Sequence, residues 1–526
     1  MARWFNIGGP CIAAQNYMLA AMERLPDVAS LIRKGQYFVV HAQRQCGKTT
    51  AFLSLANEVN AKGEAVALYC SLEALQSFPS AEDGIPKLCA LLQEAIIGEP
   101  AFGSLPDAEW PVDAMKRDAV VISGVKVALS QMAAKVAPKP LYVFFDEVDC
   151  LGGETIITFL RQLRNGKIDM GKGRPFPSSV ALIGMRDIRD YKAKIRPDSE
   201  TLGSASPFNV VTKAMTLRTF TNEEVAALYA QHTAETGQVF EPEAVRKACV
   251  ASGGQPYLVN ALARWCVEEI HREDFSKPVT GADMDEAKEK IIRERGTHLD
   301  SLMERMKEPR VRSIVEPVLL GDERSFSRND DDYRYVLDLG LLVEGSNGLL
   351  RPANPIYAET IGRYLSRDDQ DDMRQSVPET PWVREDGLDM AGLLAAFQQF
   401  WRENSDVHKP PFGYAESYPH IVLQAFLQRV INGGGQIVRE MALGSGRLDL
   451  GVHFRGGKYA VEVKLRRNYD RNREKAHDQV RRYMDHLGQS EGWLVVFDPD
   501  PAKPWDEKIA SEDIAADGKT IHVIRC

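Results

Sequence analysis

The run HAQRQCGKTT, residues 41–50, has the glycine, lysine and hydroxyl spacing of a phosphate-binding loop. Such a loop surrounds phosphate oxygens with backbone N–H groups, extends a lysine to the β- and γ-phosphates and holds Mg²⁺ on a hydroxyl. Gly47, Lys48 and Thr49 suit these roles, and Ala42 stands where another glycine is usual. We therefore predict that ATP and Mg²⁺ bind here. The other predicted nucleotide contacts are Gln45, Cys46 and Thr50.

Two acids, Asp146 and Glu147, follow the apolar run Leu141–Phe145. Such a run predicts a strand buried on both faces of a parallel sheet, and these sheets bind ligands at the carboxyl ends of their strands. We assign Asp146, together with Thr49, to Mg²⁺ and Glu147 to activation of the attacking water. A further buried run ends at Arg186, which is predicted either to contact the γ-phosphate or to form a surface ion pair.

Near the C-terminus, Asp449, Glu462 and Lys464 form a second group of residues suited to catalysis. With Gly456-Gly457 as a two-residue hairpin loop, Asp449 falls opposite Lys464 and Gly451 falls opposite Glu462, on the face opposite an apolar one. Two neighbouring carboxylates repel unless a cation joins them, which predicts Mg²⁺ or Mn²⁺. A metal-activated water, positioned by Lys464, would hydrolyse a phosphodiester.

Other polar residues surround this second group. Gln479 and Tyr483 lie on one face of a predicted helix, and Gln479 is a further catalytic candidate. Glu416, at the start of an earlier helix, is a candidate metal ligand, although an acid there also suits the helix dipole. The intervening basic residues are predicted to bind the phosphates of a nucleic acid, with a solvated helix face as the alternative. They are Arg466, Arg467, Arg471, Arg473, Lys475, Arg481 and Arg482.

The patterns of both halves resemble known families. Residues 41–50, Asp146-Glu147 and the run GQPYL at 254–258 resemble the AAA-type branch that includes the STAND and archaeal ATPases. This resemblance implies that the turn before Pro256 opens a lid helix near the nucleotide and that Pro256 contacts the nucleotide, with a proline that only starts the helix as the alternative. The runs GRLD at 446–449 and EVK at 462–464, with the Q-x-x-x-Y helix, resemble PD-(D/E)XK nucleases of the RecB type.

The elements that must position these residues predict an α/β fold of several parts. A P-loop parallel-sheet ATPase with a helical lid and a winged helix would precede a mixed α/β nuclease-like domain. The expected ranges are 1–220 for the ATPase core, 221–300 for the lid, 301–365 for the winged-helix-like module, 366–390 for a linker and 391–526 for the nuclease-like domain.

Composition and charge exclude several other kinds of protein. The 526 residues are 44% hydrophobic and 26% charged, as in soluble globular proteins. The start lacks a signal peptide and we find no apolar run of membrane-spanning length, so we expect a cytoplasmic protein without a membrane partner. The eight cysteines lack a C-x-x-C pair, which argues against a zinc knuckle. The net charge of −9 argues against non-specific nucleic-acid binding by the whole surface.

The sequence therefore predicts an ATPase whose nucleotide cycle controls or powers a metal-dependent nuclease acting on DNA or, as the less favoured substrate, RNA. Defence against foreign nucleic acid would use such a protein. One alternative is a STAND-like signalling or regulatory ATPase, and another is a mobile-element ATPase, whose last domain binds nucleic acid without cutting it. A homo-oligomer and a protein partner that acts as trigger are compatible with each.

Overall fold

The structure is a computed structural model, and the chain divides into two compact units. Unit 1 comprises Met1–His298 and Phe326–Val343, and unit 2 comprises Leu299–Ser325 and Glu344–Cys526. The described residues are 3–103, 105, 110–185, 207–319, 330–345, 348–365, 382–384, 387–404, 422–424, 426–427, 435–443, 446–498, 500, 503–516 and 518–526.

Unit 1 is built on a five-stranded sheet in the order β2-β3-β4-β1-β5. Every neighbouring pair in this sheet is parallel, which confirms the predicted α/β class. The parallel arrangement buries the central strands on both faces, as their continuous apolar runs predict. The strands are β1 (Tyr37–His41), β2 (Val66–Ser71), β3 (Leu141–Asp146), β4 (Ser179–Gly184) and β5 (Lys213–Thr216).

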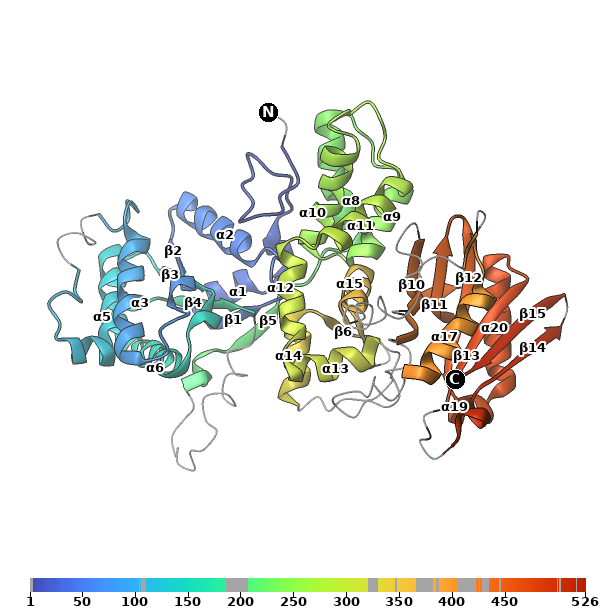
Figure 1. Cartoon of the computed structure of the whole chain (residues 1–526). Coiled ribbons are helices and arrows are strands. Elements are labelled where there is room, and N and C mark those ends of the chain that lie inside the picture. Colours follow the sequence, from blue (N-terminus) through green and yellow to red (C-terminus); the bar gives the residue numbers. More distant parts are fainter. Residues whose placement is uncertain are drawn as a thin grey trace. The chain divides into compact units, whose positions relative to one another are not determined.

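Helices cover both faces of this sheet (Figure 1). Alternate strand residues enter two cores, with Tyr37 and Val39 in one and Phe38 and Val40 in the other. The first core is completed by α3 (Ala81–Ile96), α5 (Arg117–Val136) and α6 (Gly153–Met170). The second core is completed by α1 (Val28–Arg33) and α2 (Lys48–Lys62). Short turns of helix occur at η1 (Ala21–Arg24), η2 (Glu73–Leu75), η3 (Val148–Cys150) and η5 (Pro207–Val210).

By length and composition alone, α5 is apolar enough to cross a membrane, and no other helix among the described residues is. Its buried residues, which include Val125, Leu129 and Met132, pack with α3 and α6 in the core of unit 1. A core helix of a soluble protein passes the same test, so α5 carries no assignment to a membrane.

A helical layer follows the sheet, in the range for which a lid is predicted. Thr221 and Glu224 form a capping box at the start of α8, and a proline begins both α9 and α10. The N-terminal segment joins this layer, because Phe5 and Tyr17 pack on His232 of α8. The helices are α8 (Asn222–Thr236), α9 (Pro242–Ser252), α10 (Pro256–Arg264), η6 (Trp265–Ile270) and α11 (Gly281–Glu294).

The region predicted as a winged helix contains helices and a two-stranded sheet of β6 and β7. The turn of the predicted wing is closed by the Gly345 N–H, which donates to the Leu349 carbonyl at 2.8 Å. The elements are α12 (Thr297–Met306), α13 (Pro309–Leu319), α14 (Asp331–Leu339), β6 (Leu342–Glu344), β7 (Leu350–Pro352) and α15 (Pro355–Leu365). Most of the predicted linker lies outside the described residues, and β8 (Val383–Arg384) and β9 (Gly387–Leu388) follow it.

Unit 2 contains a six-stranded mixed sheet in the order β10-β11-β12-β13-β15-β14. Strands β12, β13 and β15 run parallel, and the outer pairs are antiparallel. The apolar side chains of α17 pack on one face and those of α20 on the other. The elements are α17 (Met390–Asn404), β10 (Gly435–Leu443), β11 (Gly446–Phe454), β12 (Gly457–Leu465), α19 (Arg466–Arg471), α20 (Arg473–Leu487), β13 (Glu491–Phe497), α21 (Trp505–Lys508), β14 (Ala510–Ala516) and β15 (Lys519–Arg525).

The predicted hairpin register between β11 and β12 is wrong by two residues. Phe454 pairs with Gly457, so the two turn residues are Arg455 and Gly456 rather than Gly456-Gly457. Both have positive φ, 46° and 85°, as a type I′ turn requires. A shift of two residues leaves every side chain on its predicted face, because side chains alternate along a strand. Continued by one residue, the observed pairing sets the Asp449 position opposite Glu462 rather than Lys464.

Candidate nucleotide and phosphodiester sites

The predicted phosphate-binding loop joins β1 to α2. Gln45 and Gly47 have positive φ values of 56° and 87°, and successive residues of such alternating conformation turn their N–H groups into one anion-binding concavity. A side chain at Gly47 would be strained in this conformation, and its Cβ would lie 3.2 Å from Arg24 Nη2. Ala42 is not among the residues with positive φ, so its position does not require a glycine.

Lys48, which begins α2, is buried with 6% exposure. Its ammonium donates to the carbonyl oxygens of Ala42 at 2.8 Å and Gln43 at 3.1 Å. These neutral acceptors hold the charge at the loop. Phosphate oxygens could replace them without breaking an ion pair.

Thr49 and Asp146 meet as the metal assignment predicts. Thr49 Oγ1 donates to Asp146 Oδ2 at 2.7 Å, although the two residues come from α2 and β3. Tyr69 also donates to Oδ2 at 2.7 Å, and the Glu147 N–H donates to Oδ1 at 2.9 Å. A hydroxyl beside a carboxylate offers the hard oxygen donors that Mg²⁺ prefers, so these residues fit that ion.

Glu147 follows the strand in a left-handed conformation, with φ of 55° and ψ of 41°. Such backbone strain in a residue other than glycine persists where the surroundings enforce it, often at functional sites. Burial raises the pKa of Glu147, while the charges of Lys48 and Arg44 oppose this rise. A carboxylate with a raised pKa is suited to accept a proton from water.

The end of β4 is held by Asp149, which was not predicted as a site residue. The Met185 N–H donates to Asp149 Oδ2, and a Cβ at Gly184 would lie 2.7 Å from the same oxygen. Asp149 therefore fixes the chain immediately before Arg186. Arg186 itself lies outside the described residues.

The turn that opens α10 contacts the phosphate-binding loop through Gln255. Its Nε2 lies 3.4 Å from the Arg44 carbonyl oxygen and 3.5 Å from that of Gln45, while its Oε1 accepts from the Leu258 N–H. Pro256, the residue carried over from the family resemblance, is the buried first residue of the helix. Its predicted contact with nucleotide stays a prediction.

Two further predicted nucleotide contacts are engaged within unit 1. Cys46 is 1% exposed, and burial raises its thiol pKa, which disfavours the reactive thiolate. Thr50 Oγ1 accepts a hydrogen bond from the Cys11 N–H at 3.1 Å, so it anchors the N-terminal segment. The predicted contacts of both residues with nucleotide stay predictions.

Glu462 and Lys464 lie together at the second site. Glu462 is fully buried, and Lys464 Nζ lies 2.5 Å from its Oε1. Their neighbours Val461 and Val463 enter the core beneath α17, so both charged residues belong to the face covered by α20. The valines thus lie on the face predicted to be apolar, and Glu462 and Lys464 lie on the other face, where α20 packs with an apolar cluster of its own.

The remaining partners of this site are only partly defined. On α20, Gln479 Nε2 donates to Tyr483 Oη at 3.0 Å, which confirms their shared helix face. Asp449 lies in β11, but its side chain is outside the described residues, as is the whole of Glu416. Within the described residues, no three His, Cys, Asp or Glu side chains form a metal-binding group. Glu462 is an oxygen donor suited to Mg²⁺, yet it fits only as one member of a larger set.

Several residues of the predicted phosphate-binding strip are engaged in ion pairs. Arg466 Nη1 lies 2.9 Å from Asp498, Arg473 Nη2 lies 3.7 Å from an oxygen of Asp470, and Arg481 Nη1 lies 2.9 Å from its Asp478 partner. These acids reduce the positive charge available to a nucleic acid.

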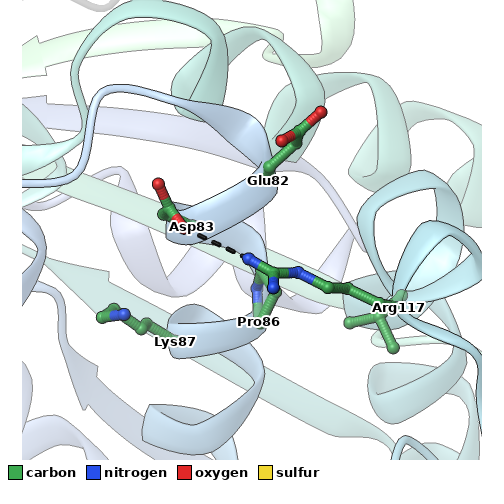
Figure 2. Close-up of a pocket in the computed structure, with 6 residues that line it drawn as sticks. Glu82, Asp83, Pro86, Lys87 and Arg117 are labelled. Carbon is green, nitrogen blue, oxygen red and sulfur yellow. Dashed lines mark hydrogen bonds and ion pairs between the residues drawn. The ribbon is translucent and has the colours of Figure 1, made fainter.

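A pocket of about 170 Å³ lies apart from all of these groups, between α3 and α5. Figure 2 shows the exposed ion pair between Arg117 and Asp83 that crosses it. None of the predicted site residues lines it. The lining residues are Glu82, Asp83, Pro86, Lys87, Arg117 and Val120.

No protein-family model and no curated protein matches the sequence. Similar solved structures include Aeropyrum pernix ORC2, in ADPNP and ADP complexes, with a TM-score of 0.36, 11% identity, and coverage of 68% of this chain and 95% of that one. The Thermotoga maritima RuvB Holliday junction branch migration motor has a TM-score of 0.34 and 12% identity, with coverage of 63% of this chain and 90% of that one. Cdc6p from Pyrobaculum aerophilum has a TM-score of 0.35 and 11% identity, with coverage of 65% of this chain and 93% of that one. Because these TM-scores are too low to carry an argument, the assignment of unit 1 to an α/β fold with a phosphate-binding loop rests on its strand order and loop geometry.

Proposed function

We propose that unit 1 binds ATP with Mg²⁺ and hydrolyses the γ-phosphate. The observation that carries this proposal is the 2.7 Å hydrogen bond between Thr49 and Asp146. It joins the end of the phosphate-binding loop to the acidic end of β3, which is the pairing that holds Mg²⁺ in P-loop enzymes. Mg²⁺, when bound, neutralises charge on the β- and γ-phosphates.

The chain's own residues would divide the remaining work. Lys48 would exchange its two carbonyl acceptors for phosphate oxygens and neutralise their charge. Glu147, with its raised pKa, would orient the attacking water and accept its proton. Tyr69 and the Glu147 N–H would keep the Asp146 carboxylate oriented.

The same loop also contacts the segment of unit 1 that precedes the predicted wing. His41 Nδ1 lies 3.6 Å from Asp338 Oδ1, and a Cβ at Gly340 would overlap the Gln43 side chain. A change in the loop on nucleotide binding would therefore be felt at the C-terminal end of α14. This contact supports a role for ATP as a regulator.

We also propose that unit 2 hydrolyses phosphodiesters in DNA or, as the less favoured substrate, RNA. The support is the buried Glu462 with Lys464 on one face of a mixed sheet, next to the Gln479 helix. Asp449 and Glu416 would complete the oxygen ligands for Mg²⁺ or Mn²⁺. Defence against foreign nucleic acid, self-association and a protein trigger are compatible extensions of this proposal.

The second candidate function is binding of nucleic acid without cleavage, in a signalling or mobile-element ATPase. The ion pair between Glu462 and Lys464 favours it, because a carboxylate already compensated by a lysine has less need of a metal. Metal-dependent cleavage separates the two. With Mg²⁺ or Mn²⁺ the purified protein should cut DNA or RNA, whereas a protein that binds but never cuts supports the second candidate.

Hydrolysis of ATP is the test of unit 1. The purified protein should release phosphate from ATP in Mg²⁺, and Lys48→Ala should stop that release. Lys87→Ala is the matched control, because Lys87 is an exposed lysine of the same unit. Normal hydrolysis by Lys48→Ala would refute the proposed site.

A further inference from the structure

Arg24, at the end of η1, is a buried arginine that contacts the phosphate-binding loop from outside. It is only 6% exposed. Its Nη2 donates to the Cys46 carbonyl oxygen and its Nη1 to that of Arg218, both at 2.9 Å. The guanidinium carbon lies 4.9 Å from the centre of the Phe220 ring. Among the described residues, its Nε–H is buried without a hydrogen-bond partner.

The bond to Cys46 determines the orientation of the next peptide N–H. In a trans peptide the C=O and the following N–H point in opposite directions. When Arg24 holds the Cys46 carbonyl outside the loop, the Gly47 N–H must point to the inside, where phosphate oxygens would bind. A guanidinium also places a positive charge behind this peptide.

Gln255 acts in the same way on the two preceding peptides. Its contacts with the carbonyls of Arg44 and Gln45 turn the N–H groups of Gln45 and Cys46 inward. Three consecutive loop N–H groups are thus oriented by two side chains outside the loop.

The two side chains belong to one connected region. The Phe220 N–H donates to the Gly254 carbonyl at 2.8 Å, which ties the segment that receives Arg24 to the turn that carries Gln255. The first segment lies between β5 and α8, where the chain passes from the sheet into the helical layer, and the second lies between α9 and α10. The orientation of the loop is therefore linked to the position of α10.

We propose that Arg24 is a positioning residue, which holds the phosphate-binding loop in its anion-binding shape and links that shape to the lid. This inference rests on the proposed nucleotide site. It assigns Arg24 to the phosphates rather than to the base or ribose. Loss of Arg24 should therefore weaken the binding of nucleotides that carry a β-phosphate and leave the binding of nucleoside monophosphates unchanged.

The test is calorimetric titration of the full chain with ATP, ADP and AMP in Mg²⁺, with AMP taken to millimolar concentration. Arg24→Met keeps the length of the side chain but removes its donors. We expect about tenfold weaker binding of ATP and ADP, as for loss of one charged hydrogen-bonding group, and no change for AMP. Arg117→Met is the matched control, because the Arg117 side chain is 72% exposed and distant from the loop in its contacts.

Arg24→Lys provides a second variant if the methionine variant does not fold. Lysine keeps the charge but offers one nitrogen where Arg24 uses two, so ATP binding should be intermediate and AMP binding again unchanged. The inference is overturned if folded variants bind ATP as wild type does, or if they lose AMP and ATP affinity equally, which would indicate a structural role. A wild type that binds none of the three nucleotides would instead refute the proposed function of unit 1.

Discussion

The two candidate sites differ in how their charged groups are paired. In unit 1, Lys48 is held by backbone carbonyls and Asp146 by hydroxyls and an N–H, all of them neutral partners. In unit 2, the fully buried Glu462 is paired directly with Lys464. The first site can accept a nucleotide and a cation without losing an ion pair. At the second, a metal on Glu462 would share a carboxylate that already has a lysine as its partner.

This difference suggests a direction of control. Lys464 is 26% exposed, so separating it from Glu462 should cost less than the about 3–5 kcal/mol that follows loss of one partner of a fully buried pair. A ligand shifts an equilibrium only by the difference between its affinities for the two states, and such coupling is typically about 1–3 kcal/mol. Nucleotide would therefore control the second site if it bound the state with the ion pair released more tightly than the state with the pair intact. In this proposal, nucleotide binding at the first site is the switch, and the second site is inactive until its ion pair is released.

The largest expected effect is loss of cleavage at the site in unit 2. Glu462→Gln removes the charge that would hold the metal, so cleavage of DNA should fall by about 10³-fold or more, while ATP hydrolysis continues. Gel assays of cleavage and phosphate release on the same preparation measure both. Glu474→Gln is the control, since Glu474 is exposed on α20. Full cleavage by the Glu462 variant would exclude this site as the catalyst.

The next largest effect is loss of ATP hydrolysis at the site in unit 1. Lys48→Ala removes the ammonium that would stabilise the transferred phosphate, and kcat for ATP hydrolysis should fall by about 10²–10³-fold. If nucleotide controls cleavage, the same variant should also lose ATP-stimulated cutting. Stimulation retained in a Lys48→Ala variant that no longer binds ATP at this site would instead place the controlling nucleotide elsewhere.

A smaller effect separates binding from chemistry within unit 1. Glu147→Gln should lower kcat by about 10²-fold and leave ATP affinity unchanged, because only the proton acceptor is lost. Burial raises the pKa of Glu147, and the base works deprotonated, so wild-type kcat should rise with pH through a value above that of an ordinary glutamate. An acid limb at the ordinary value in a pH–rate profile would count against this role.

The smallest effect concerns stability beside the loop. His298 is 4% exposed, and burial, aided by the charge of Arg44, lowers its pKa to about 4. The unfolded chain, with an ordinary histidine pKa, binds more protons below pH 6.5, so folding stability falls with acid. Relative to His298→Gln, wild type should lose about 2 kcal/mol of unfolding free energy between pH 7 and 5. Equal pH dependence in denaturant titrations would show that His298 is not neutral when folded.

The sequence predicted the elements of both sites well because each motif is local. Strand β3 with Asp146 and Glu147, the start of α2 at Lys48, and the polar face of Glu462 and Lys464 all follow from apolar runs and strand alternation. The hairpin register was missed because two adjacent glycines hid the alternative turn at Arg455-Gly456. The alternation of side chains preserved the facial assignment despite this error.

The residues that orient the phosphate-binding loop could not be predicted. Arg24 and Gln255 act on backbone carbonyls of a distant segment, and Asp149 holds the N–H of Met185. Backbone groups leave no pattern in a sequence. The only signal for Arg24 was an arginine within an otherwise ordinary helical turn, which is equally typical of a solvent-exposed position.

Control of the second site by the first is tested most directly by one cleavage assay. Single- and double-stranded DNA and RNA are incubated with the protein and Mg²⁺ or Mn²⁺, with no nucleotide, with ATP, or with a non-hydrolysable analogue. We predict cleavage that requires nucleotide and is lost in Lys48→Ala. Cutting with the analogue would identify a switch, and cutting with ATP alone would identify a process driven by hydrolysis. Equal cutting with and without nucleotide would contradict the proposed control.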